Sequence, residues 1–195
     1  MDNFLNSSIA QNMVNFKLPR YNELPNIGLY MDQVILIIEN SLKPLFSPQQ
    51  GSIITSTMVS NYVKQKLVSP PLKKKYSQNH IAYLIVVCLL KQVYSISEIC
   101  ELIEIQINSY SIEVAYNYFC EEQENALQAA FSTRQFSAES FAQEVTSESE
   151  LVRSGVLCFA NKVYIQKYLQ YKKMEIMDIA EDLQPRLTGK KHRLS

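Results

Sequence analysis

The chain has 195 residues, 47% of them hydrophobic, and its 19 basic and 19 acidic residues give a formal net charge of zero. This length allows one domain or two small ones, and a composition poor in glycine favours a globular, mainly helical fold. The N-terminus lacks the basic start and apolar run of a signal peptide. The longest apolar run, Ile81 to Leu90, is about half as long as a membrane span requires. We therefore expect a cytoplasmic protein that does not enter a membrane.

The residue types that usually carry catalysis and metal binding are few and scattered. The cysteines form no C-x-x-C pair, and only His80 and His192 could join them, so we expect no zinc site and no disulfide framework. All four thiols lie in apolar helical patterns, which predicts structural, slowly reacting groups at Cys88, Cys100, Cys120 and Cys158. No glycine-rich phosphate loop or nucleophile–base pair is present, so we expect neither an enzyme nor a cofactor.

Apolar residues at helical spacing predict six helices, over about residues 28–42, 55–67, 78–91, 97–106, 112–131 and 147–172. The third of these is apolar nearly all round, which indicates burial on most sides or sharing with a partner. His80, three residues after Ser77, is expected to help start that helix or to touch a phosphate. The glutamates of the fifth helix are expected on a solvated face: Glu121, Glu122 and Glu124.

The charges are distributed unevenly. Between Glu39 and Glu98 there is no acidic residue, and seven lysines fall there: Lys43, Lys64, Lys66, Lys73, Lys74, Lys75 and Lys91. A long stretch of one sign fits a polyanion, and nucleic acid is the commonest polyanion. Residues 98–151 hold eleven glutamates and one basic residue, Arg134. This acidic block either belongs to a separate surface or partly screens the lysines.

The helix predicted over about residues 55–67 has two distinct faces. Thr55 is a plausible N-cap. One face carries small polar side chains and a lysine, at Thr57, Ser60, Asn61 and Lys64, and the other is apolar, at Val59, Tyr62, Val63 and Leu67. A short helix of this kind suits the major groove of DNA, where asparagine pairs naturally with adenine. The same pattern also fits a surface helix that faces only water.

A short basic segment follows this helix. Ser69-Pro70-Pro71 ends the helix, because proline lacks the N–H group and its ring disfavours the helical conformation of the residue before it. Lys73, Lys74, Lys75 and Tyr76 then form an extended stretch that is long enough for a small wing. We expect these lysines, with Lys64 and Lys66, to hold phosphates.

The order of helix, Pro-Pro, basic turn, Tyr-Ser and apolar helix resembles the winged helix-turn-helix of MerR-type regulators. That family reads Arg-Tyr-Tyr-Glu-Arg-x-Gly-Leu-Leu in its recognition helix, and the aligned stretch here reads Ser-Asn-Tyr-Val-Lys-Gln-Lys-Leu-Val. Tyr62 and Lys64 fit the pattern. Ser60, Val63 and Lys66 replace its arginine, glutamate and glycine. The wing is also shorter than in the family and has no glycine.

A closer resemblance, over about residues 18–105, is to an uncharacterised bacterial family, domain of unknown function 1836. Three strings carry it: LPxxxLYMDQV (Leu24 to Val34), TxxMxxNYVK (Thr55 to Lys64) and PPxKKKYS (Pro70 to Ser77). This resemblance implies a family and no function.

Together these observations predict an all-α protein, with a MerR-like winged helix-turn-helix of short wing followed by a C-terminal helical domain. We divide it into an N-terminal arm (1–27), the DNA-binding domain (28–107), a dimerisation or sensing domain (108–183) and a basic tail (184–195). The tail is either a solvated end or a second DNA arm.

We expect a homodimeric transcriptional regulator that binds double-stranded DNA and has an unknown small-molecule or protein effector. Its expected DNA-binding residues are Thr57, Ser60, Asn61, Tyr62, Lys64, Lys66, Lys73, Lys74, Lys75 and Tyr76. The alternative is a protein-interaction module on the same scaffold without DNA binding. The basic lysines favour the first function and the acidic middle of the chain favours the second.

Overall fold

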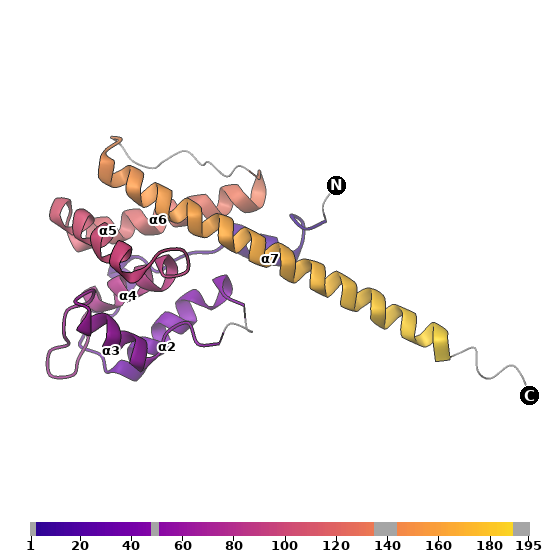
Figure 1. The fold of residues 1–195 in the computed structure, drawn as a ribbon, viewed down its shortest axis with the longest axis horizontal. Helices are drawn as coiled ribbons and strands as arrows, with labels where there is room; N and C mark the ends of the chain where they lie inside the picture. Colours follow the sequence, from indigo (N-terminus) through magenta and orange to yellow (C-terminus); the bar gives the residue numbers. More distant parts are fainter. Residues whose placement is uncertain (1–2, 48–50, 135–143, 189–195) are drawn as a thin grey trace, which may run out of the picture.

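The computed structural model describes residues 3–47, 51–134 and 144–188, with side chains up to Met177 (Figure 1). Within these residues the fold is all-α, as predicted, and its only β-structure is two isolated bridges. The α-helices are α1 (Ser8–Val14), α2 (Met31–Leu42), α3 (Ser56–Lys64), α4 (Gln78–Leu90), α5 (Ile96–Ser109), α6 (Ile112–Ser132) and α7 (Ser147–Thr188). Two 3-10 turns, η1 (Tyr21–Glu23) and η2 (Lys43–Leu45), complete the described elements. Most of the predicted basic tail lies outside the described residues.

All six predicted helices are present, and most begin directly after a serine or threonine N-cap. Thr55, Ser95 and Ser111 each accept a hydrogen bond from the backbone N–H three residues on, which satisfies a helix N-terminus. At α4, the N–H of Ser77 donates to Nδ1 of His80 over 3.0 Å. The expectation that His80 helps to start this helix is confirmed.

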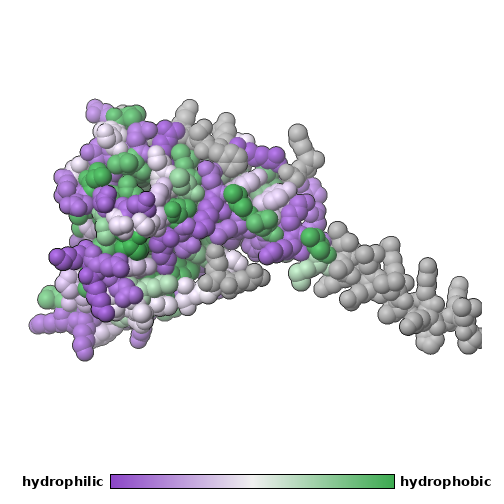
Figure 2. Space-filling model, viewed as in Figure 1, coloured by the Kyte–Doolittle hydropathy of each residue, from purple (hydrophilic) through white to green (hydrophobic). Residues whose placement is uncertain are grey.

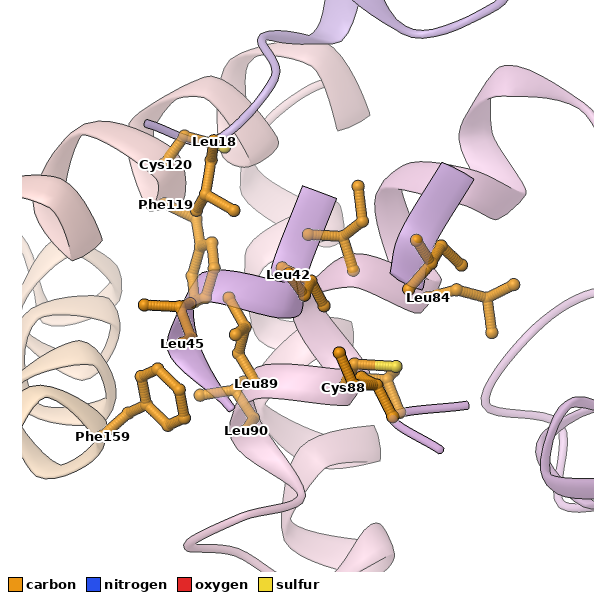
Figure 3. Close-up of a cluster of buried hydrophobic side chains, with 14 of the residues drawn as sticks. Leu18, Leu42, Leu45, Leu84, Cys88, Leu89, Leu90, Phe119, Cys120 and Phe159 are labelled. Atoms are coloured by element: carbon orange, nitrogen blue, oxygen red, sulfur yellow. The ribbon is translucent and has the colours of Figure 1, made fainter. Parts of the chain in front are cut away.

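The core is one continuous cluster organised around α4, which buries nine residues (Figure 3). Because α4 is apolar nearly all round, it must be covered on every side. It packs on α2 on one side and on α6 and α7 on the other. The segment expected to be an arm belongs to this core: Phe4 is fully buried among Phe131, Tyr164 and Tyr168. Helix α1 within it is short, and its buried residues are Ala10 and Met13.

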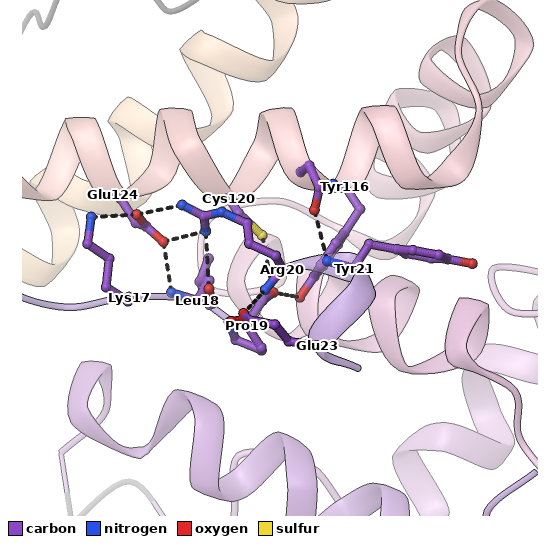
Figure 4. A network of polar contacts seen from close by, with 10 residues as sticks. Lys17, Leu18, Pro19, Arg20, Tyr21, Glu23, Tyr116, Cys120 and Glu124 are labelled. Carbon is purple, nitrogen blue, oxygen red and sulfur yellow. Dashed lines mark hydrogen bonds and ion pairs between the residues drawn. The ribbon is translucent and has the colours of Figure 1, made fainter. Parts of the chain in front are cut away.

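Glu124 of α6 fixes the chain between α1 and η1 (Figure 4). Both its oxygens accept from the Arg20 guanidinium, over 2.6 and 2.9 Å, and Lys17 and the Leu18 N–H also donate to it. Burial alone would raise the pKa of the Glu124 carboxyl, but these hydrogen bonds hold it below its ordinary value. The expected solvated face is therefore wrong at Glu122 and Glu124, which are both buried.

The structure also separates the four cysteines. Cys88 and Cys120 are buried, and burial raises the pKa of each thiol to about 12. Cys100 is partly buried. Cys158 is exposed on α7, so the expectation that every thiol is shielded is wrong there. Its neighbours Phe159 and Ala160 are buried, which shows that the face of the helix, not its local composition, decides exposure.

Replacing Glu124 by Gln should lower the free energy of unfolding at pH 7 by about 2–3 kcal/mol, because a bidentate ion pair to a half-buried arginine loses its charge. The folded-state pKa of Glu124 is lowered, so its contribution is present above the unfolded pKa and disappears as pH falls through the folded one. The difference between the two proteins should therefore shrink in acid. Urea unfolding at pH 7 and in mild acid measures it. Glu101→Gln, at an exposed position of α5, is the control; a Glu124→Gln protein as stable as wild type at pH 7 would contradict the role given to the carboxylate.

In dilute native protein, a disulfide reagent should modify Cys158 first and leave Cys88 and Cys120 untouched until the chain unfolds. The thiolate is the reactive form, and both burial and a raised pKa suppress it at the two core positions. Mass spectrometry of the labelled peptides identifies the order. Early labelling of Cys88 would mean that the α4 core opens far more readily than its packing indicates.

Candidate nucleic-acid interface

Helix α3 is positioned by the loop that precedes it. Oε1 of Glu39, on α2, accepts from the backbone N–H groups of Ile53 and Ile54 over 2.8 and 3.3 Å. Lys91, at the end of α4, donates to the Ile53 carbonyl over 2.6 Å. Thr55 then caps α3 directly. Glu39 and Lys91 thus fix the orientation of α3, a role that no sequence motif marked.

The predicted polar face of α3 is exposed, and the apolar face is buried. Thr57, Ser60, Asn61 and Lys64 all lie on the surface. The Ser60 hydroxyl donates to the Ser56 carbonyl over 2.8 Å, so part of its hydrogen-bonding capacity is already used. Within the described residues, the Asn61 amide makes no hydrogen bond, so both its donor and its acceptor are available on this face.

Lys66 ends α3 in the left-handed conformation, with φ at 61°. The backbone then folds back, since the Leu67 N–H donates to the Tyr62 carbonyl over 3.0 Å. Glycine is the residue that usually occupies such a position, because a Cβ atom is disfavoured there. This is also why α3 ends earlier than its predicted end near residue 67.

The basic segment forms a tight turn at the far end of α3 (Figure 1). The Lys75 N–H donates to the Leu72 carbonyl over 2.9 Å, and Lys73 and Lys74 between them have φ of 50° and 64°. Two consecutive left-handed residues define a type I′ turn, which usually contains Asn-Gly. In Figure 2 the corresponding lower-left corner is strongly hydrophilic.

A second bridge attaches this turn to the body. Tyr76 and Leu29 exchange both backbone hydrogen bonds, over 2.8 and 2.9 Å. The Lys75 stem packs on Gly28, where an added Cβ would lie 3.0 Å from Lys75 Cδ, and its ammonium is 5.5 Å from the Tyr30 ring centre. Lys75 is thus partly committed to packing, whereas Lys73 and Lys74 project freely from the tip.

The two tyrosines among the expected DNA-binding residues lie in the core. Tyr62 is 6% exposed and Tyr76 is 5% exposed, and burial raises the pKa of both hydroxyls. Because both rings are buried, neither can contact a bound ligand. Their role is to pack beneath α3 and the turn. The other eight expected residues are all exposed, and we call them together the basic surface: Thr57, Ser60, Asn61, Lys64, Lys66, Lys73, Lys74 and Lys75.

Neither a metal site nor a membrane-spanning helix is found in the described part of the chain. No three His, Cys, Asp or Glu side chains come together there in a way that would hold a metal ion. None of its helices combines the length and the apolar character needed to cross a membrane.

No curated protein and no solved structure matches the chain. A family model, the domain of unknown function DUF1836, matches residues 19–119. The two ends of the matched range lie close together in the fold. Near its first residue, the Pro19 carbonyl accepts a hydrogen bond over 2.9 Å from the hydroxyl of Tyr116, which is near its last residue. Since the match covers more than half of the sequence, the chain belongs to the DUF1836 family.

Proposed function

We propose that this protein is a cytoplasmic transcriptional regulator that binds double-stranded DNA as a homodimer. The observation that carries the proposal is the placing of lysines at three positions of positive φ, Lys66, Lys73 and Lys74. A left-handed conformation costs an L-residue with a Cβ about 1 kcal/mol relative to glycine. Three such residues in one basic surface therefore lower the stability of the fold, and binding a polyanion is a function that accounts for them.

The basic surface offers separate residues for the two kinds of contact that DNA binding requires, contacts to phosphates and contacts to base edges. The lysines at the end of α3 and at the turn suit contacts to phosphates. Such contacts position a protein on the duplex and carry no sequence information. The Asn61 amide, exposed in the middle of α3, suits an adenine edge in the major groove. In the MerR-like alignment the position of Lys66 is glycine, and its left-handed φ supports that alignment. The tight turn at Leu72–Lys75 would take the place of a two-stranded wing.

The dimer is proposed to form along α7. Its residues at heptad-like spacing lie exposed on one side: Leu151, Cys158, Ile165, Leu169 and Ile176. Ile165, Leu169 and Ile176 are 60, 55 and 66% exposed, although the opposite side of α7 is buried against α6. Figure 2 shows hydrophobic surface along α7 where it leaves the body. Apolar residues at heptad-like spacing form a stripe along the helix, here called the apolar seam. A second copy of the same helix can pack against such a seam.

One observation favours the alternative, a protein-interaction module. Three large apolar side chains are exposed beside the basic turn: Leu72 at 78%, Ile27 at 68% and Tyr30 at 57%. Apolar residues on a rim of lysines also suit an acidic protein partner. DNA binding by variants of the basic surface separates the two functions.

The double substitution Lys73→Asn, Lys74→Gly should stabilise the fold while it weakens DNA binding. Asn-Gly is the preferred pair for a type I′ turn, so the free energy of unfolding should rise by about 1 kcal/mol. Affinity for every DNA sequence should fall, and the log–log salt dependence should flatten by about 0.9 for each phosphate that is no longer neutralised. Urea unfolding and fluorescence anisotropy on genomic DNA fragments measure the two effects.

Asn61→Ala is the matched comparison. It should cost roughly 1–3 kcal/mol on a preferred site, change non-specific binding little and leave the salt dependence almost unaltered. Both variants must be compared at the same ionic strength. If they weaken specific and non-specific DNA alike, α3 is not the recognition helix. If neither changes DNA binding, the basic surface serves a protein partner.

The double substitution Ile165→Glu, Leu169→Glu should convert a dimer into a monomer, because it places like charges along the apolar seam of α7. Light scattering measures the mass. The protein concentration should be roughly 50 µM, at which a functional dimer is expected to be associated. Leu36→Glu, at a residue of α2 that is 60% exposed, is the matched control and should remain dimeric. In the wild type, Cys158 should react more slowly as the concentration rises. A wild-type monomer at this concentration refutes the proposed dimer.

A further inference from the structure

An open cavity of about 830 Å³ lies on a side of the molecule not used by the basic surface. Its walls come from α1 and the segment after it, from the end of α2 and η2, and from α7. The lining is mixed: apolar side chains of Ile9, Met13, Phe16 and Pro44 accompany the amides of Asn12, Asn40 and Gln170. One lysine of α7, Lys167, also lines it.

Lys167 is unusual among the lysines of the chain. It is only 7% exposed, and none of the described residues gives its ammonium a hydrogen bond or an ion pair. Burial lowers its pKa. A charge that is partly removed from water is costly without a counter-ion, and it attracts an anion more strongly than a fully exposed lysine does.

The other charges around the cavity already have partners. Lys17 donates to Glu124 over 2.8 Å, and Glu23 accepts from the Arg20 backbone N–H over 2.6 Å. Among the described residues of this lining, Lys167 is thus the one uncommitted cation, and the Glu23 carboxylate opposes a ligand of high negative charge. These charges fit a monoanion better than a phosphate dianion. The amides of Asn12, Asn40 and Gln170 supply donors, and the apolar wall suits a hydrocarbon body.

We infer that this cavity binds a small monocarboxylate with an apolar body, and that Lys167 forms the ion pair with its carboxylate. The ligand would lie between α2, which carries α3, and α7, which carries the proposed dimer seam. A regulatory role for such a ligand rests on the proposed DNA binding, whereas its binding to the cavity does not.

The test uses the full chain with hexanoate, inorganic phosphate and hexan-1-ol as probes, and isothermal calorimetry as the measurement. Hexanoate should bind the wild type and should bind Lys167→Met at least about tenfold more weakly, since the variant cannot form the buried ion pair. Hexan-1-ol, which lacks the charge, should bind both proteins weakly and equally. Lys173→Met, at an exposed lysine on the same helix, should match the wild type.

Gln170→Glu provides a second variant that keeps Lys167 and adds a carboxylate to the lining. It should also weaken hexanoate binding, so the inference stays testable if Lys167→Met fails to fold. Three results would overturn it: no binding of hexanoate to the wild type, binding of hexanoate by both cavity variants as tight as by the wild type, or a preference of the wild type for phosphate over hexanoate. Because none of these measurements involves DNA, their failure is distinguishable from failure of the proposed function.

Discussion

The rest of the structure depends on the need to cover α4 on every side. A helix that is apolar around its whole circumference is stable in water only inside a shell, at about 25 cal/mol for each Å² of apolar surface removed from water. The chain supplies that shell from both ends: α2 from the N-terminal half, α6 and α7 from the C-terminal half. The basic surface and the α7 seam are therefore carried by one core, and a change at Leu84, Cys88 or Leu89 would reach both.

Local periodicity was sufficient to predict the helices but not the contacts between them. The six predicted segments have apolar residues at helical spacing, and most have a serine or threonine at or just before their starts, which are local signals. The attachment of Arg20 to Glu124 joins residues 104 positions apart, and no spacing rule connects them. The same limit explains the errors at Glu122 and Cys158: composition indicates that a helix forms, whereas the packing of α6 on α7 decides which side is buried.

The candidate site also has one feature that the sequence could predict and one that it could not. The exposed polar face of α3 follows from helical geometry and could be predicted from Thr57, Ser60, Asn61 and Lys64 alone. The left-handed lysines could not, because a lysine is not expected where glycine or asparagine is more stable. That conflict between local preference and observed conformation is itself informative, since such conflicts concentrate at functional sites.

The neutral net charge of the chain conceals a separation in space. The sequence left open whether the glutamates of residues 98–151 screen the lysines. In Figure 1 the helices α5 and α6, which carry most of the described glutamates, lie on the side of α4 opposite α3 and α2. At physiological ionic strength, charges separated by more than about 8 Å of solvent are largely screened from each other. The glutamates across the core therefore do not cancel the local positive potential around the exposed lysines.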